Sequence, residues 1–293
     1  MCAYVSAGRK AQCYAAPHVK TVKLVDGAKI SGKGIGPITV SNLREAEYFA
    51  EAGFNDIIYA VSMVPAKLAR AFNDGAGTEC SGVLTHAGES YGCFSEQELV
   101  KAANHEHAAI TLAAENIRAA GIACPIVSCD STPTTTYATD LSGVTELRAG
   151  VYVFQDVFQV GLGSCSHTRV ALSVLTTVIS HKNNQNRIIT DAGGVALFKD
   201  QSTRGTDFDC GYGLVADVDG TIMENLYVSG ANQEHGIITT IDGKDFDFGR
   251  FAIGTKPRIL PNHSCMTAAA YDQYNVIEGT LEISEVRTRC NCW

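Results

Sequence analysis

The chain has 293 residues, of which 45% are hydrophobic and 18% are charged, and it carries a formal net charge of −8. That length is enough to bury one large core or two adjoining ones, so we expect two domains. No segment concentrates lysine and arginine, which argues against a nucleic-acid partner, and no apolar stretch is long enough to cross a bilayer.

The start of the chain and its cysteines indicate the cytoplasm. Arg9 and Lys10 interrupt the apolar region that a secretory signal would need. Eleven cysteines are scattered from Cys2 to Cys292 without a CxxC pair or the regular spacing of a disulfide framework. Reduced cysteines are typical of the cytoplasm, so we expect a cytoplasmic protein whose partner is a small molecule.

Strand and helix signals alternate through the first half of the chain. Residues 38–60 read as strand, helix and strand, with apolar positions at helical spacing from Leu43 to Phe49 and Gly53 as the helix stop. The pattern recurs as a short apolar run, an alanine-rich helix and a further strand, at Gly82–Leu84, Glu98–Ala120 and Pro125–Ser128. Repeated alternation predicts a parallel sheet with helices outside it.

Beyond about Ser164 the pattern changes to short β-rich runs separated by Asn, Asp and Gly. These runs are Val170–Ser180, Arg187–Thr190, Gly213–Val218, Gly236–Ile241 and Val276–Ile283. We therefore predict an α/β barrel domain at residues 1–163, joined to a C-terminal antiparallel β domain at residues 164–293.

The motif PHVKT, residues 17–21, places Lys20 just ahead of the first strand–helix unit. A lysine at the C-terminal end of a barrel strand would point into the region where such barrels do their chemistry. Partial burial there favours the neutral, nucleophilic amine that a Schiff-base lysine requires. Taken by itself, the motif equally describes an exposed lysine at a strand end.

Two motifs have the residue types of an anion site. LRAGVY, residues 147–152, sets a fixed cation, Arg148, two residues before Gly150, whose backbone can approach an anion closely. STPT, residues 131–134, supplies hydroxyls and a proline that fixes the turn. Both motifs fall at the ends of successive predicted strands, which favours a shared site. An ordinary strand with a bulge is the alternative for LRAGVY.

The motif PNHSC, residues 261–265, places His263 and Cys265 two residues apart, on the same face of an extended segment. Imidazole and thiolate are good ligands for zinc-like ions, so the pair could supply two of them. A structural histidine beside a cysteine is the alternative, because two residues do not complete a site. The loop motifs THAGESY and GANQEHG, residues 85–91 and 230–236, read as solvated turns, and no role is assigned to their histidines.

Read in order, these motifs resemble a known family. PHVKT, ITVSNLREAEYFAEAG, GVLTHAGESY, VTELRAGVYVF, TDAGG, GANQEHG and PNHSC resemble the D-serine dehydratase-like family of fold type III pyridoxal-phosphate enzymes, which includes D-threonine aldolase. The resemblance implies a TIM-like barrel of the alanine racemase type, pyridoxal 5'-phosphate and a divalent metal as cofactors, and a homodimer. Zinc, manganese and cobalt all remain open as the metal.

The resemblance also implies a role for each matching residue. Lys20 would form the Schiff base with the cofactor, and His263 and Cys265 would be the metal pair. The remaining cofactor-binding residues would be Thr132, Gly150 and Val151 at the phosphate, Arg148 at the pyridine nitrogen, and Tyr91 and Tyr152 as neighbours of the cofactor.

The implied activity is that of a lyase that eliminates water and ammonia from a D-3-hydroxy amino acid. The substrate would be D-threo-3-hydroxyaspartate or D-serine and the product a 2-oxo acid, by way of a Cα carbanion and a metal-bound hydroxyl. Retro-aldol cleavage, as in D-threonine aldolase, is an alternative, although Cys265 and the residues around it favour the dehydratase.

Two departures from the family pattern bear on activity. The segment from Ala71 to Ser81 leads almost directly into the strand at Gly82, where the family has about two more βα units, which a closed barrel needs. Asp130 stands immediately before STPT, where the family usually has glycine, and places a carboxylate beside the predicted phosphate site. We therefore predict an incomplete barrel, and a non-catalytic, degenerate cofactor- or metal-binding relative is the second alternative.

Overall fold

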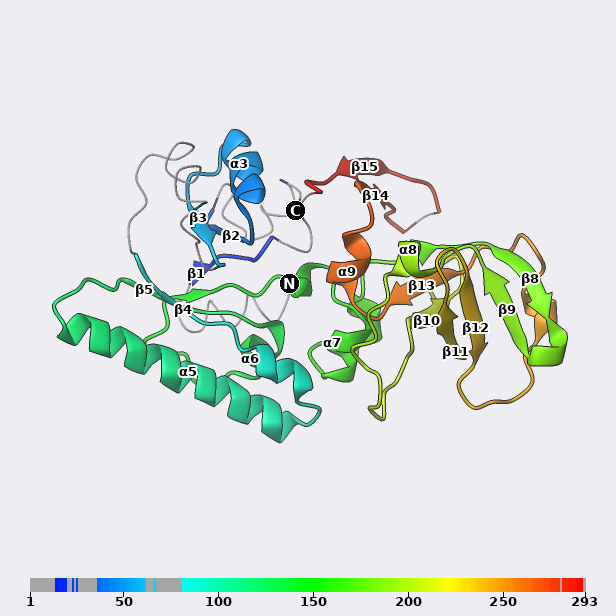
Figure 1. Ribbon diagram of the computed structural model, residues 1–293, viewed down its shortest axis with the longest axis horizontal. Coiled ribbons are helices and arrows are strands. Elements are labelled where there is room, and N and C mark those ends of the chain that lie inside the picture. Colours follow the sequence, from blue (N-terminus) through cyan, green and yellow to red (C-terminus); the bar gives the residue numbers. More distant parts are fainter. Residues whose placement is uncertain are drawn as a thin grey trace. The chain divides into compact units, whose positions relative to one another are not determined.

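The computed structural model describes residues 14–19, 23, 25, 36–61, 66, 81–279 and 281–291. The chain divides into two compact units (Figure 1). The first unit contains the described residues up to Val153 together with residues 290 and 291, and the second runs from Phe154 to Arg289. The sequence predicted a boundary after residue 163. Residues 154–163 instead group with the second unit, where the buried Asp156 accepts a hydrogen bond from the backbone N–H of Ser264.

The sheet of the first unit is parallel. β4 (Gly82–Leu84) pairs with β5 (Ile126–Cys129), β5 pairs with β6 (Glu146–Leu147), and β6 pairs with β1 (Tyr14–Ala15). Just beyond β1, His18 bridges in parallel to Thr39 of β2 (Ile38–Val40), and β2 pairs with β3 (Ile57–Tyr59). The described strands therefore follow the order β4-β5-β6-β1-β2-β3. β6, the last described strand of this unit along the chain, pairs with β1, the first one, as the last and first strands do in a closed α/β barrel.

The two edges of this order are β3 and β4, which are consecutive in the chain. Within the residues that the structure describes, β3 pairs only with β2, and β4 pairs only with β5. Residues 62–65 and 67–80, which include most of the segment where the sequence departs from the family, lie outside the described residues. The α/β class is confirmed, whereas the loss of two βα units stays a prediction.

Two described helices of the first unit, α3 and α5, begin at side-chain caps. The Asn42 side chain accepts from the Glu45 N–H at the start of α3 (Leu43–Glu51), and the chain then turns at Gly53 with φ of 92°. Ser95 and Glu98 form a capping box at the start of α5 (Glu96–Ala119). The buried face of α5 packs against β5 and β6, through Ile110, Ala114, Val127 and Leu147. Both helices lie where the sequence predicted them.

The second unit is built on a seven-stranded sheet in which every pairing between strands is antiparallel, as the sequence predicted. Its order is β7-β13-β10-β11-β12-β9-β8. The strands are β7 (Val174–Leu175), β8 (Val178–Lys182), β9 (Arg187–Thr190), β10 (Gly213–Ala216), β11 (Ile222–Ala231), β12 (Gly236–Thr240) and β13 (Arg258–Pro261). Its core contains the fully buried side chains of Val178, Ile188, Val215, Val228, Ile238 and Ile259.

Short helical turns connect these strands. They are α7 (Val157–Gly161), α8 (Gly194–Leu197) and α9 (Ser264–Ala268), with 3-10 turns at η4 (His167–Arg169), η5 (Asn183–Gln185) and η6 (Phe248–Arg250). One predicted strand is wrong. Val276 instead ends β14 (Gln273–Val276) of a separate hairpin, and the described residues 277–279 and 281–283 lie between it and β15 (Glu285–Thr288), with Gly279 at φ of 69°. The β-rich run misled the prediction because its apolar side chains, such as Leu281 and Ile283, are exposed.

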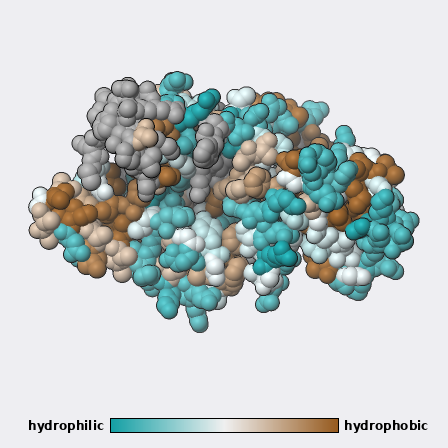
Figure 2. Space-filling view, in the orientation of Figure 1, coloured by the Kyte–Doolittle hydropathy of each residue, from teal (hydrophilic) through white to brown (hydrophobic). Residues whose placement is uncertain are grey.

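Both units expose apolar side chains among polar ones. On the face shown in Figure 2, hydrophobic and hydrophilic residues are interspersed over the described parts of each unit. None of the helices in the described part of the chain has the length and hydropathy needed to span a bilayer.

Candidate cofactor and metal sites

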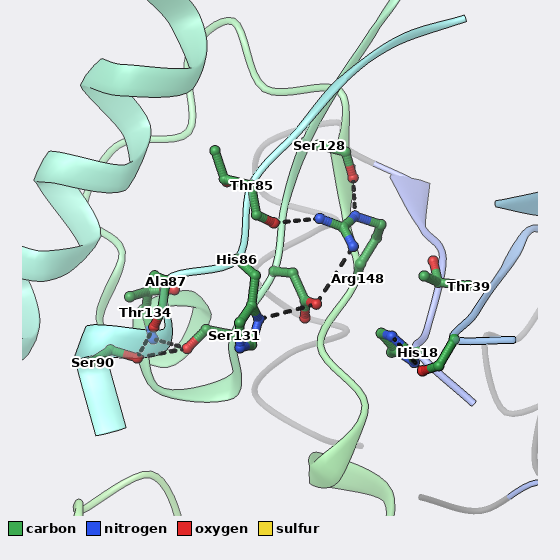
Figure 3. Close-up of polar contacts among 12 residues, drawn as sticks. His18, Thr39, Thr85, His86, Ala87, Ser90, Ser128, Ser131, Thr134 and Arg148 are labelled. Atoms are coloured by element: carbon green, nitrogen blue, oxygen red, sulfur yellow. Dashed lines mark hydrogen bonds and ion pairs between the residues drawn. The ribbon is translucent and has the colours of Figure 1, made fainter. Parts of the chain in front are cut away.

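Polar side chains converge at the carboxyl ends of the parallel strands in the first unit (Figure 3). Thr85 and His86 directly follow β4, Asp130 follows β5, Arg148 follows β6, and His18 follows β1. The carboxyl ends of parallel strands meet at one edge of the sheet, which is where α/β barrels carry their functional residues. This edge is therefore the candidate cofactor site.

Arg148 is the centre of this network, and its side chain is almost completely buried. Its Nε donates to the Ser128 hydroxyl at 2.8 Å, and its guanidinium donates to the Thr85 carbonyl oxygen and forms an ion pair with Asp130 at 3.4 Å. The Ser128 hydroxyl in turn donates to the Glu146 carboxylate at 2.5 Å. Burial raises the pKa of Glu146, although the Ser128 hydrogen bond and the Arg148 charge oppose this. These contacts fix the plane of the guanidinium.

Asp130 lies between this guanidinium and two histidines. Its Oδ2 is 3.2 Å from Nδ1 of His86. Burial raises the pKa of the Asp130 carboxyl, but the His86 hydrogen bond and the charges of His18, Arg148 and His86 outweigh burial and leave the pKa below its ordinary value. The carboxylate that the sequence placed beside the phosphate site is therefore paired with the Arg148 guanidinium and lies within hydrogen-bond distance of the His86 imidazole.

This lowered pKa predicts a pH dependence of stability. A carboxyl whose pKa is lower in the folded state stabilises the fold above the ordinary value of 3.8, and that stabilisation is lost as the pH falls through the folded pKa. We expect Asp130→Asn to lower the free energy of unfolding near neutral pH, by about 1–3 kcal/mol for a buried charged hydrogen bond. The difference from the unaltered protein should shrink at about pH 3. Urea unfolding at several pH values measures it, and a difference that grows on acidification would contradict the ion pairing.

Glu106 of α5 bonds to residues at the ends of two strands, and no motif in the sequence pointed to it. It accepts hydrogen bonds from the hydroxyls of Thr85 at 2.8 Å and Thr134 at 2.6 Å, and from the backbone N–H of Asp130 at 3.2 Å. Its side chain is buried, and its partners lie 21 to 28 residues away in the chain. Glu106 therefore fixes the STPT segment relative to the end of β4.

The STPT segment supplies a buried hydroxyl that suits a phosphate. Thr132 is 3% exposed, and its Oγ1 has no hydrogen-bond partner within the described part of the protein. A buried unsatisfied hydroxyl costs about 1–3 kcal/mol, and a phosphate oxygen would satisfy it. Thr132, at the start of α6 (Thr132–Tyr137), therefore fits the phosphate group of the predicted cofactor.

Gly150 lies where the backbone after β6 approaches the backbone after β1 closely. A Cβ at Gly150 would lie 2.2 Å from the carbonyl oxygen of His18, so the close approach is to the backbone that follows β1. Val151 and Tyr152 are buried in η3 (Val151–Val153). Tyr91, on η2 (Gly88–Gly92), has its ring centroid 6.2 Å from that of His86. These residues all belong to the first unit, and their roles toward the cofactor stay predictions. Lys20 lies outside the described residues.

The second unit contains the predicted metal pair, but not on an extended segment. β13 ends at Pro261, His263 occupies the N-cap position of α9 without a side-chain capping hydrogen bond, and Cys265 lies inside that helix. The chain turns here because the buried Asp156 accepts from the N–H of Ser264 at 2.9 Å and from the N–H of Gln159 at 2.8 Å. The side chains of His263 and Cys265 nevertheless meet, through a hydrogen bond that raises the pKa of the imidazole.

His263 also contacts Asp200, which sequence reasoning missed. Nδ1 of His263 is 2.5 Å from Oδ2 of Asp200, and both side chains are partly exposed. Burial lowers the pKa of His263, but the hydrogen bonds to Asp200 and Cys265 and the nearby negative charges raise it to about 10. Imidazole and thiol together suit zinc and similar ions. The described residues contain no group of three or more His, Cys, Asp or Glu side chains arranged for a metal. His263 and Cys265 would therefore supply two of the ligands of a metal ion.

Comparison with known proteins identifies relatives along most of the chain. The model "Alanine racemase, N-terminal domain" matches residues 63–157, and "Putative serine dehydratase domain" matches residues 171–277. D-threo-3-hydroxyaspartate dehydratase of Delftia sp. (strain HT23) is 39% identical over 337 aligned positions, which cover 92% of this chain and 88% of that enzyme. D-serine dehydratase of Dictyostelium discoideum is 31% identical over 209 positions, which cover 69% of this chain and 52% of that enzyme.

Solved structures show the same relationship in three dimensions. The structure of the Delftia enzyme superposes with a TM-score of 0.92 at 35% identity, over 99% of this chain and 94% of that one. D-threonine aldolase from Filomicrobium marinum shares the fold, with a TM-score of 0.74 at 16% identity, over 98% of this chain and 90% of that one. The fold is thus that of the alanine racemase-like α/β proteins with an added β domain. The chain belongs to the D-serine dehydratase-like family of pyridoxal-phosphate-dependent dehydratases.

Proposed function

We propose that the protein is a pyridoxal-phosphate- and divalent-metal-dependent lyase that converts a D-3-hydroxy amino acid into a 2-oxo acid and ammonia. The observation that carries the proposal is that one chain holds both donor sets, a buried hydroxyl and guanidinium at the strand ends and an imidazole–thiol pair beside α9. The relatives named dehydratases support this reaction class.

Each donor set has its own task in this reaction. Pyridoxal phosphate, when bound, supplies a sink for the electrons left behind when the Cα proton is removed. In the proposal, Lys20 carries the cofactor and moves that proton, while Thr132, Gly150 and Val151 hold the phosphate. Arg148 presents its fixed guanidinium to the pyridine nitrogen, and its charge is balanced by Asp130.

His263 and Cys265 are proposed to hold the metal ion, with zinc as the first choice because a thiolate and an imidazole favour it. A bound divalent ion supplies a Lewis acid for the departing β-hydroxyl. Loss of the Cα proton and the β-hydroxyl removes one water. The dehydrated product then takes up water and loses ammonia, so the net products are a 2-oxo acid and ammonia. We further propose a cytoplasmic homodimer.

Incubation of the purified protein with three substrates tests this proposal. We expect ammonia and a 2-oxo acid from D-threo-3-hydroxyaspartate or D-serine, and no glycine from D-threonine. Glycine and an aldehyde from D-threonine would indicate retro-aldol cleavage instead. The assay should be run with zinc, manganese and cobalt in turn, because the ligand pair accepts all three.

A second candidate function is cofactor or metal binding without turnover. The 337 positions aligned with the Delftia enzyme exceed the 293 residues of this chain, so that enzyme has residues that find no counterpart here. Two missing βα units would account for this difference and would leave the barrel open between β3 and β4. Cofactor binding without ammonia, 2-oxo acid or glycine from any of the three substrates would favour this candidate.

A further inference from the structure

Asp200 lies outside every predicted motif, yet its carboxylate is in close contact with the His263 imidazole. Its Oδ2 is 2.5 Å from Nδ1 of His263, although the two residues are 63 positions apart in the chain. Its other oxygen, Oδ1, accepts the Ser202 hydroxyl at 3.0 Å. Both carboxylate oxygens therefore have a partner in the protein. Oδ2 contacts Nδ1 of the imidazole, and Oδ1 accepts from Ser202.

The buried side-chain amide of Asn262 connects the segment that carries Asp200 to the segment that carries His263. Asn262, which directly precedes His263, is 1% exposed. Its Oδ1 accepts the backbone N–H of Ser202 at 3.0 Å, and its Nδ2 donates to the Thr203 hydroxyl and the Gly211 carbonyl oxygen, each at 2.7 Å. The turn that carries Asp200 is thus bound to the residue next to the histidine. The buried hydrogen bonds of Asn262 therefore hold the backbone segments of Asp200 and His263 close together, which keeps the carboxylate in contact with the imidazole.

We propose that Asp200 is a positioning residue that orients His263 for metal binding. By accepting the Nδ1–H of the imidazole, it leaves Nε2 as the nitrogen that gives up its proton when a metal ion binds, and it fixes the plane of the ring in which Nε2 points. Metal-binding histidines commonly donate their second nitrogen to a carboxylate in this way. The inference rests on the proposed metal pair and adds the residue that prepares it.

Asp200 acts through His263 and is not itself a ligand in this proposal. Coordination by Oδ2 would require that oxygen to give up the 2.5 Å contact to Nδ1, and coordination by Oδ1 would break the bond from Ser202. Asp156, the other carboxylate beside the pair, is fully buried, with its two oxygens bonded to backbone N–H groups of Ser264 and Gln159. Asp156 therefore shapes the backbone, and Asp200 orients the ring.

The test is the affinity of metal-free full-length protein for Co²⁺, followed by the absorption of the cobalt–thiolate bond. We expect Asp200→Ala to weaken binding by about 10–100-fold. Asp200→Asn should weaken it less, because an amide oxygen still accepts the Nδ1–H. Asp242→Ala is the matched control, since Asp242 is an exposed carboxylate that bonds Asn225 and Lys244 in the same unit, and its affinity should not change. Circular dichroism and thermal unfolding confirm that each variant is folded.

The outcomes separate this inference from the proposed function. Unchanged affinity in folded Asp200→Ala overturns the positioning role, as does an equal loss in Asp200→Asn and Asp200→Ala, which would mean that the charge and not the hydrogen bond matters. Loss of cobalt binding in His263→Ala and Cys265→Ala, together with graded losses at position 200, supports it. If the unaltered protein binds no cobalt through His263 and Cys265, the metal pair itself fails, and the positioning role fails with it.

Discussion

Replacing Lys20 with alanine should abolish turnover of every D-3-hydroxy amino acid and prevent covalent attachment of the cofactor. The amine is proposed both to bind pyridoxal phosphate and to move the Cα proton, so we expect kcat/KM to fall by at least about 10³-fold. The unaltered protein, loaded with pyridoxal phosphate, should show the absorption band of a lysine-bound cofactor. Borohydride should then fix the cofactor to the peptide that contains Lys20.

The chain offers a matched control three residues away. Lys23 forms an ion pair with the buried Glu45 at 2.9 Å, so its ammonium is held by a carboxylate and is not available as a nucleophile. Lys23→Arg preserves that charge and should leave both the absorption band and turnover unchanged. A cofactor fixed by borohydride to Lys23, or a band that survives in Lys20→Ala, would contradict the assignment.

Sequence periodicity was sufficient for the elements whose stabilising contacts are local. The segment 38–60 folds as strand, helix and strand, as predicted, because Asn42 caps the helix and Gly53 ends it with a positive φ. The long helix α5 was likewise predicted from its alanine-rich run, and it begins two residues before the predicted start because Ser95 and Glu98 form a capping box. Local signals of this kind need no knowledge of the rest of the chain.

Contacts between distant residues were beyond the reach of the sequence. Nothing in the amino-acid sequence links Glu106 to Thr134 or Asp200 to His263, because each contact depends on how distant segments are arranged in the fold. The same limit explains the strand predicted at residues 276–283, since a β-rich run is stable as a strand only if a partner covers its apolar side chains. The order β6-β1-β2 was also invisible, although the family resemblance implied a barrel.

Asp130 illustrates how a residue read as a departure can be accommodated. Its carboxylate was predicted to lie beside the phosphate site, as a departure that bears on activity, because the sequence showed only its neighbours in the chain. In the structure its charge is paired with Arg148 and shared with His86. A buried carboxylate with cationic partners costs far less than an isolated one, so the position does not by itself argue against cofactor binding.

Removing the metal pair should separate the two halves of the proposed reaction. In His263→Ala or Cys265→Ala we expect elimination of water to slow by about 10²-fold or more, since a Lewis acid contributes several kcal/mol to stabilising the departing hydroxide. Exchange of the Cα proton with deuterium from solvent should persist in the same variants, because that step is assigned to Lys20 and the cofactor. Mass spectrometry of the recovered amino acid measures exchange, and 2-oxo acid release measures elimination.

Cys93→Ser is the control for loss of a thiol, because Cys93 is a partly exposed cysteine of the first unit that bonds only weakly to the Glu89 carbonyl oxygen. It should retain both exchange and elimination.

The pH dependence of metal binding gives a second check. The pKa of His263 is raised to about 10 in the metal-free protein, so metal binding must displace a proton and should tighten as the pH rises toward that value. Equal losses of exchange and elimination in His263→Ala would mean that the metal pair supports the site as a whole and not the departing hydroxyl alone.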